Sequence, residues 1–248
     1  MSDCPQMILS RVENHVMYIT FHNPAFKNGL NWQGFGQLCD CYQQVIDDPS
    51  IRLVVLCGSD GYFFTGGRVD AKNPGEQEKY SAALARHTQL SNKLPVPRIA
   101  AINGHCLKGG MSVLAYSDFA IAQDGVEFGF PEVRMGGAPM VVMANTIQLM
   151  PRKFALEAYL TSWNFSAQDA YRLGMVNRVV SEEEFWPTVD RYVQCILNTP
   201  KDLVDMTRKA YFAMAELPNR QDRVDLAMKM LQEEVLPSME HRKTEYNV

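Results

Sequence analysis

Residues 102–139 read I-N-G-H-C-L-K-G-G-M-S-V-L-A-Y-S-D-F-A-I-A-Q-D-G-V-E-F-G-F-P-E-V-R-M-G-G-A-P. An apolar strand is predicted just before them, over 98–102, and it runs into a turn that contains glycine. The pair Gly109 and Gly110 then opens an apolar helix that is expected to last to about Ser117. Short strands are predicted over 119–122 and 126–128. This succession of buried strands and an apolar helix indicates an α/β fold.

The start of that helix is suited to binding a negative oxygen. The first amides of a helix have no acceptor within the helix and lie at the positive end of its dipole. Glycine allows a ligand to come close to the backbone. Glu132 follows in F-G-F-P-E-V, a carboxylate within an apolar segment. A carboxylate in such a setting indicates a functional group.

Two nucleotide-binding motifs do not fit these glycines, whereas a packing role does. In the span from Gly104 to Gly109 the lysine precedes the second glycine and no serine or threonine follows it, so a nucleotide phosphate loop is rejected. None of the sixteen glycines gives the spacing of a dinucleotide-binding fingerprint. Taken alone, the pair Gly109 and Gly110 is explained as well by close packing of a helix on a strand.

A second glycine-containing turn also follows a predicted buried strand. The apolar run 52–57 predicts a buried strand, and G-S-D-G-Y-F-F-T-G-G-R-V-D follows it. Two such turns could present two backbone amides to one oxygen, although an ordinary surface loop would also explain the second turn. His87, on the apolar face of a helix predicted over 76–93, is interpreted as a core residue and kept as a minor catalytic candidate.

The remaining segments predict an N-terminal hairpin over 7–12 and 16–21, and a helix capped by Asn31. A capping box is expected at Ser166 and Asp169. From residue 186 onward only helices are predicted. We therefore expect a core over 1–185 and a helical region over 186–248, whose methionine-rich faces fit either an internal core or a subunit interface.

Composition excludes several classes of function. The chain has 248 residues, 46% of them apolar, and a net charge of -4. Without a long basic run it is not expected to bind nucleic acid, and without a targeting pattern or an 18-residue apolar stretch we expect a cytoplasmic protein that does not enter membranes. The six cysteines show no paired spacing, so neither a disulfide framework nor a metal site is expected.

Taken together, these motifs resemble the crotonase superfamily, which has the enoyl-CoA hydratase/isomerase fold. The resemblance covers nearly the whole chain, and it lies in these segments: N-P-A-F-K-N-G-L, F-F-T-G-G-R-V-D, I-N-G-H-C-L-K-G-G-M-S, F-G-F-P-E-V, S-A-Q-D-A-Y-R-L-G-M-V-N-R-V-V and E-H-R-K. It implies a spiral of repeated ββα units, C-terminal helices that assemble a homotrimer or homohexamer, and an acyl-CoA substrate. Coenzyme A would enter as the substrate thioester, with no other cofactor.

Carried over by position, the resemblance implies that the amides of Arg68 and Gly109 stabilise a thioester enolate, a charge that preorganised amides stabilise well. Gly66 and Gly67 would line the coenzyme A site, and Lys27 would lie near the nucleotide end, where a cation suits phosphate. A solvated loop lysine remains the alternative for Lys27.

Departures from the family pattern decide which reaction is expected. Hydratases of the family carry two glutamates, and this chain has Ser112 at the first position and Glu132 at the second. Isomerases of the family use one glutamate, at the position of Glu132, and the branch that hydrates and cleaves hydroxycinnamoyl-CoA has a serine at the position of Ser112. The aspartate of the usual G-A-D-L is displaced to Asp70. After Pro139 stands M-V-V-M, which should narrow or reshape the acyl pocket.

The sequence thus predicts an acyl-CoA enzyme with one glutamate for proton transfer, either an isomerase or a single-glutamate hydratase. A hydroxycinnamoyl-CoA hydratase-lyase-like enzyme is an alternative. A protein that binds coenzyme A without turnover is another. In the catalytic versions Glu132 is expected to have a raised pKa because its surroundings are apolar.

Overall fold

The computed structural model describes residues 5–69, 73 and 75–239, and these residues form two compact units, 1–193 and 194–248. Asp70 and the E-H-R-K segment, about which the sequence made predictions, lie outside the described residues. The units divide inside α7 (Glu182–Leu197), and Phe185, Val189 and Val193 on this helix are buried. The ring of Tyr192 on this helix also lies 5.6 Å from that of Phe119.

The first unit contains two sheets. The larger has the order β1-β2-β3-β5-β7-β10, with β1 and β2 antiparallel and the other neighbours parallel. Its strands are β1 (Ile8–Glu13), β2 (Val16–Phe21), β3 (Leu53–Gly58), β5 (Arg98–Ile102), β7 (Phe119–Gln123) and β10 (Arg178–Val180). Strands β3 and β5 are buried along their whole length, as a parallel sheet covered on both faces requires. The expected α/β class with parallel strands is confirmed.

The smaller sheet has the order β4-β6-β8-β9, and of its strands the sequence predicted only β8, one residue early, over 126–128. Its strands are β4 (Tyr62–Phe64), β6 (His105–Leu107), β8 (Glu127–Gly129) and β9 (Phe165–Ser166). Each of β3, β5 and β7 in the large sheet is followed by β4, β6 or β8 in the small sheet and then by a helix. This repetition brings the turn that follows each short strand to one region of the unit.

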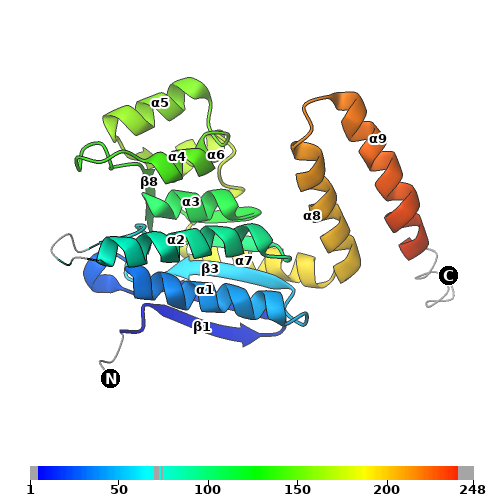
Figure 1. The fold of residues 1–248 in the computed structure, drawn as a ribbon, viewed down its shortest axis with the longest axis horizontal. Coiled ribbons are helices and arrows are strands. Elements are labelled where there is room, and N and C mark those ends of the chain that lie inside the picture. The colour runs from blue at the N-terminus through cyan, green and yellow to red at the C-terminus, as the bar shows by residue number, and fades with distance from the viewer. Residues whose placement is uncertain (1–4, 70–72, 74, 240–248) are drawn as a thin grey trace. The chain divides into compact units, whose positions relative to one another are not determined.

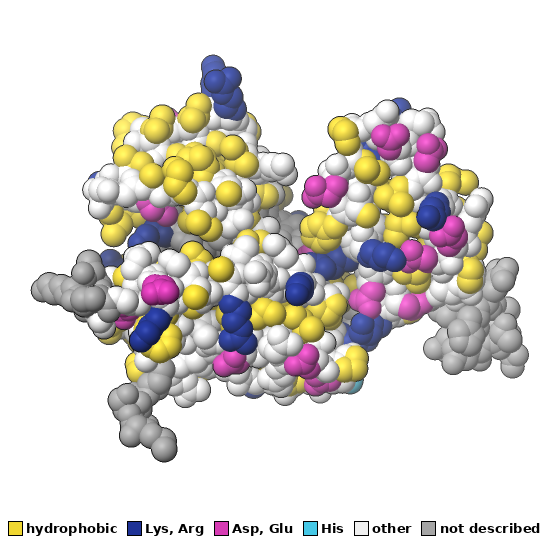
Figure 2. Space-filling view, in the orientation of Figure 1, with side chains coloured by type: hydrophobic (Ala, Val, Ile, Leu, Met, Phe, Trp, Pro, Cys, Tyr) yellow, Lys and Arg dark blue, Asp and Glu magenta, His cyan; other side chains and the backbone are white. Residues whose placement is uncertain are grey.

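Helices cover the sheets in chain order. Figure 1 shows α1, α2, α3 and α4 following one another across the first unit, with α1 and α2 side by side. The helices are α1 (Trp32–Asp47), α2 (Glu76–Lys93), α3 (Gly109–Tyr116), α4 (Met140–Thr146), α5 (Arg152–Thr161) and α6 (Ala167–Arg172). The predicted caps are confirmed, since Asn31 accepts from the amides of Gln33 and Gly34, and a capping box is present at Ser166. Apolar side chains gather on the surface over α4 and α5 (Figure 2).

The second unit is helical, as predicted. It contains the end of α7, then α8 (Lys201–Ala215) and α9 (Arg220–Met230), followed by a wider helical turn over Leu231–Val235. Helices α8 and α9 form an antiparallel pair (Figure 1), and Lys209 on the first donates to Glu234 at 2.9 Å. Large apolar side chains of this pair remain exposed, including Tyr211 and Met228.

Candidate active site

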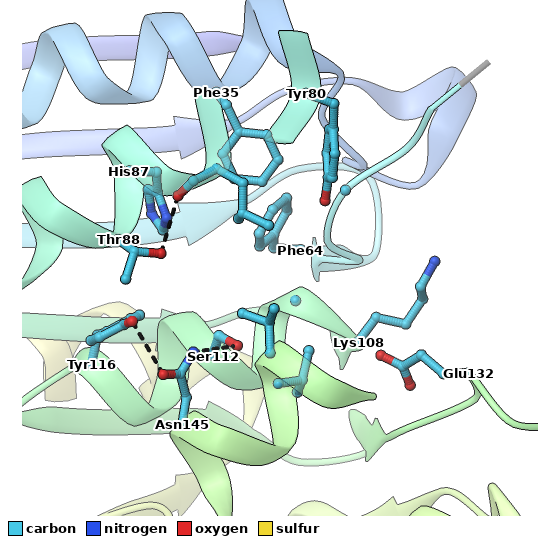
Figure 3. Close-up of a pocket in the computed structure, with 15 residues that line it drawn as sticks. Phe35, Phe64, Tyr80, His87, Thr88, Lys108, Ser112, Tyr116, Glu132 and Asn145 are labelled. Carbon is cyan, nitrogen blue, oxygen red and sulfur yellow. Dashed lines mark hydrogen bonds between the residues drawn. The ribbon is translucent and has the colours of Figure 1, made fainter. Parts of the chain in front are cut away.

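Four of the seven predicted site residues meet at one cavity of about 130 Å³. Gly67, Gly109, Ser112 and Glu132 all line it, although they are far apart in the sequence. Figure 3 shows the cavity between aromatic and aliphatic side chains of α1 and α2 on one side and residues of α3 and α4 on the other. Val141 and Val142 are among the lining residues, so the segment M-V-V-M forms part of the cavity wall.

The two glycine turns touch, and both need glycine at the contact. A Cβ built on Gly66, whose φ is +84°, would lie 2.5 Å from the Gly109 nitrogen. A Cβ on Gly109 would lie 2.6 Å from the Gly66 Cα. Real Cβ atoms do not approach other atoms this closely, so a side chain at either position would push the turns apart. The close contact between the two turns therefore needs glycine at both positions, and this contact lies beside the cavity that Gly67 and Gly109 line.

The structure corrects the expected amide donor in the first turn. The Arg68 amide donates to the carbonyl oxygen of Leu30 at 2.9 Å, so that the bridge between Leu30 and Gly67 already uses it. The Arg68 guanidinium lies 3.5 Å over the ring of Phe26, and Arg68 does not line the cavity. The neighbouring Gly67 does line it, and its amide has no acceptor within the described part of the chain. The geometry therefore favours Gly67, together with Gly109, the first residue of α3.

Glu132 has the setting that was expected for a proton-transfer group. Its carbonyl oxygen accepts from the amides of Met135 at 3.0 Å and Gly137 at 2.8 Å, which folds the segment after it into a tight turn. Its Oε2 is buried and has no hydrogen-bond partner among the described residues. Burial raises the pKa of Glu132 above its ordinary value, and its own backbone N–H and the Lys108 ammonium oppose part of that rise.

Ser112 belongs to a hydrogen-bond chain along the cavity wall. The Asn145 side-chain nitrogen donates to Ser112 Oγ at 3.1 Å, and the Tyr116 hydroxyl donates to Asn145 Oδ1 at 3.1 Å. Figure 3 shows this chain on the side of the cavity away from Lys108 and Glu132. Sequence reasoning missed Asn145 and Tyr116. The signal that could have found Asn145 is its amide within the otherwise apolar helix M-V-V-M-A-N.

His87 lines the cavity and is a packed, neutral residue. It is only 4% exposed, its Nε2 lies 3.3 Å from Ser91 Oγ, and its ring centroid is 5.4 Å from that of Phe35 and 5.6 Å from that of Tyr42. Burial, with a smaller contribution from the Arg98 charge, lowers the pKa of His87 to about 4. This agrees with the core interpretation of His87.

Lys27 lies outside the cavity lining. It follows the short turn Pro24–Phe26, with its ammonium 5.3 Å from the centroid of the Tyr62 ring. Its carbonyl oxygen accepts from Thr65 Oγ1 at 2.8 Å, which ties this segment to the turn at Gly66 and Gly67. Among the described residues, no cluster of side chains has the geometry to hold a metal ion, and no helix is long and apolar enough to cross a membrane.

Comparisons with known proteins agree with this architecture. Residues 11–245 match the family model for enoyl-CoA hydratase/isomerase. The chain is 30% identical to (E)-benzylidenesuccinyl-CoA hydratase of Thauera aromatica, over 84% of this chain and 82% of the relative, and 28% identical to crotonyl-CoA hydratase of Syntrophomonas wolfei, over 82% and 80%.

Solved structures show the same fold. An enoyl-CoA hydratase of Mycobacterium smegmatis superposes with a TM-score of 0.83 at 24% identity over 97% of both chains. The enoyl-CoA hydratase of Bacillus anthracis gives 0.83 at 21% identity, also over 97% of both chains. With a family model that spans almost the full sequence and relatives that share most of its length, this chain belongs to the enoyl-CoA hydratase/isomerase family of the crotonase superfamily.

Proposed function

We propose that the chain transfers a proton at the α carbon of an acyl-CoA thioester. Glu132 acts as the acid and base, and the amides of Gly67 and Gly109 donate to the thioester oxygen. The observation that carries the proposal is that Gly67, Gly109 and Glu132, whose Oε2 is buried without a hydrogen-bond partner, line one small cavity. Removing the α proton moves negative charge to the thioester oxygen, where two preorganised amides stabilise it.

The second half of the reaction has two versions. In an isomerase, Glu132 returns the proton at the γ carbon. In a hydratase, a proton is added at the α carbon and the hydroxyl of a water molecule at the β carbon, and in the reverse direction both leave as water. Several relatives at 27–30% identity are named as hydratases or dehydratases, which supports the second version. A lyase that cleaves a hydrated product, or coenzyme A binding without turnover, remains an alternative outcome of the test below.

The test is to incubate the protein with a panel of short and aromatic acyl-CoA thioesters in deuterated water and to follow α- and γ-deuterium by mass spectrometry. Glu132→Gln should reduce exchange by about 10²- to 10⁴-fold, the usual contribution of a general acid or base. Glu127→Gln is the matched control, because Glu127 is exposed and bonded to Asn164. Binding without exchange in the wild-type protein would favour the non-catalytic alternative, and unchanged exchange in Glu132→Gln would exclude Glu132.

We also propose that the ββα units form the spiral of the family. We further propose that the chain assembles as a homotrimer or homohexamer. The support for assembly is the exposed apolar surface, which includes Met140, Leu160 and Trp163 in the first unit and Tyr211 and Phe212 in the second. Large exposed apolar patches mark interaction surfaces. Light scattering coupled to size-exclusion chromatography tests this, and a monomer at micromolar concentration would contradict it.

A further inference from the structure

Lys108, the residue before α3, has a backbone conformation that ordinarily belongs to glycine. Its φ is 53° and its ψ is -122°. Lys27 and Ser162 also have positive φ, but their ψ values of 42° and 27° lie in the small left-handed region that is open to residues with a side chain. The angles of Lys108 are those of the first central residue of a type II′ turn, where glycine is preferred. A lysine at this position is therefore strained.

The surrounding structure holds Lys108 in this conformation. Its amide donates to the Gly129 carbonyl at 3.0 Å, and its carbonyl accepts from the Met111 amide at 3.0 Å. A Cβ built on Gly66 would lie 3.3 Å from the Lys108 Cβ, so the stem of the lysine lies close to the first glycine turn. Glycine would make the same two hydrogen bonds without strain. Strained residues that persist in this way gather at ligand sites, so the lysine side chain itself needs an explanation.

The side chain of Lys108 lines the cavity and brings a positive charge to it. Figure 3 shows Lys108 and Glu132 at one end of the cavity, away from Ser112 and Asn145. Lys108 is the one lysine or arginine among the described residues that line the cavity, and within the described part of the chain its ammonium forms no ion pair. This cation is therefore available to a ligand.

The position of Lys108 indicates which part of a ligand would meet the ammonium. Gly109, the next residue, is a proposed donor to the thioester oxygen, and Glu132 is the proposed acid and base at the α carbon. The ammonium therefore lies near the first carbons of the acyl chain. A carboxylate there would raise the pKa of Glu132 further, and the charge of Lys108 already opposes the rise that burial causes. An ammonium and a carboxylate also form one of the stronger kinds of hydrogen bond.

We infer that Lys108 is a specificity residue that binds a carboxylate on the α or β carbon of the acyl group. The preferred ligands are short dicarboxylic acyl thioesters, of which the succinyl thioester, with its carboxylate on the β carbon, is the simplest for a test. The inference deepens the proposed function by naming a substrate class. It rests on that function for the placement of the thioester oxygen at Gly67 and Gly109.

Calorimetric binding of two ligands of equal size to the wild-type protein tests the inference. They are succinyl-CoA and 4-methylpentanoyl-CoA in their carba forms, in which a methylene group replaces the thioester sulfur and prevents hydrolysis. The two differ only at the end of the acyl chain, where the first has a carboxylate and the second an isopropyl group. The carboxylate analogue should bind about 10- to 100-fold more tightly, as expected for a hydrogen bond between charged groups. Equal or weaker binding of it, or failure of both to bind, would overturn the inference.

Lys108→Met removes the charge and keeps the length of the side chain. The preference should disappear, with the affinity for the isopropyl analogue kept within about threefold. A preference that survives would assign the carboxylate to another group. An equal loss for both analogues would assign the ammonium to coenzyme A, which they share. Either result would overturn the inference. Lys93→Met, at an exposed position near the end of α2, is the matched control and should keep the preference.

Lys108→Gly tests whether the lysine is kept for the ligand or for the fold. Glycine adopts the backbone angles of Lys108 without strain, so the midpoint of urea unfolding should be unchanged or higher while the preference is lost. A lower midpoint would mean that the side chain supports the fold and would overturn the inference. The binding of this variant also decides the case if Lys108→Met does not fold.

The inference and the proposed function can fail separately. A wild-type protein that shows the preference without α-deuterium exchange would support the inference and contradict the proposed function. Exchange without the preference would do the reverse.

Discussion

The buried histidine beside the cavity should make the stability of this protein sensitive to mild acid. His87 has a pKa of about 4 in the folded chain, against 6.5 for an unperturbed histidine. The unfolded chain therefore binds a proton more readily than the folded one wherever the pH lies between these values. Acidification through this window shifts the equilibrium towards unfolding, and the stability is regained as the pH rises above about 6.5.

The size of the effect follows from the two pKa values. At about 1.4 kcal/mol per unit of pKa difference, the full loss of stability, reached well below pH 4, is about 3.5 kcal/mol. Between about pH 7 and pH 5 the same linkage gives a loss of about 2 kcal/mol. Such a change is a large part of the total stability of an ordinary domain, about 5–15 kcal/mol. The loss of stability between pH 7 and pH 5 can be measured without interference from most carboxylates, because they stay ionised in that range.

The assay is urea unfolding of the wild-type protein and of His87→Gln at several pH values between 5 and 7. The protein concentration is held fixed, because any assembly would make the apparent stability depend on it. His87→Gln lowers stability at pH 7 by disturbing the packing with Phe35 and Tyr42, but its free energy of unfolding should fall less steeply with acid. The two curves should converge by about 2 kcal/mol from pH 7 to pH 5. Parallel curves would refute the reasoning and mean that His87 has the same pKa in the folded and the unfolded chain.

Four other changes test the site and the core around it. Glu132→Gln should raise the midpoint of thermal unfolding at pH 8, because burial raises the pKa of this carboxyl and disfavours its ionised form. The gain in midpoint should vanish as the pH falls below 4.5, where the wild-type carboxyl is protonated in both states. A gain that persists at that pH would contradict this explanation. Gly110→Ala places a Cβ 2.2 Å from the Phe64 carbonyl oxygen and should cost about 1–3 kcal/mol in urea unfolding, so an unchanged midpoint would argue against this contact. Asn28→Ala should lower the free energy of unfolding by about 2–4 kcal/mol, because the fully buried Asn28 side chain donates to two carbonyls of the 59–62 turn and accepts from one backbone amide. A loss below about 1 kcal/mol would mean that water replaces the side chain in these hydrogen bonds. Lys27→Gln should weaken binding of butanoyl-CoA about two- to fivefold without affecting butanoyl-pantetheine, and equal losses for both would exclude a contact with the nucleotide.

Elements that depend on near neighbours in the chain could be predicted from the sequence. The helix after Asn31 is capped by that side chain, and the helix after Ser166 has its capping box, both through hydrogen bonds between residues two or three apart. The buried strand Leu53–Gly58 is recognisable from its continuous apolar run. Local sequence contains the information in each case because the partners lie within one turn or one strand.

The small sheet could not be predicted in this way. Its strands Tyr62–Phe64 and His105–Leu107 have three residues each, too few for a periodic pattern to appear, and Glu127–Gly129 was predicted, one residue early, without its partners. Each is a strand because a partner from a distant part of the chain supplies its hydrogen bonds. The same sheet brings the two glycine turns together, so the meeting of Gly66 and Gly109 is a tertiary fact as well.

The candidate site shows the same division. The sequence by itself was sufficient to locate both glycine turns, Glu132, and the serine in place of a second carboxylate. Only the tertiary structure decided which amide of the first turn is available, because a hydrogen bond from Arg68 to Leu30, 38 positions away in the sequence, already uses the expected one. It also placed Ser112 in a hydrogen-bond chain, because the packing of α4 against α3 brings the Asn145 side-chain nitrogen within 3.1 Å of its hydroxyl. Hydrogen bonds between elements that are distant in sequence depend on packing, which no local pattern encodes.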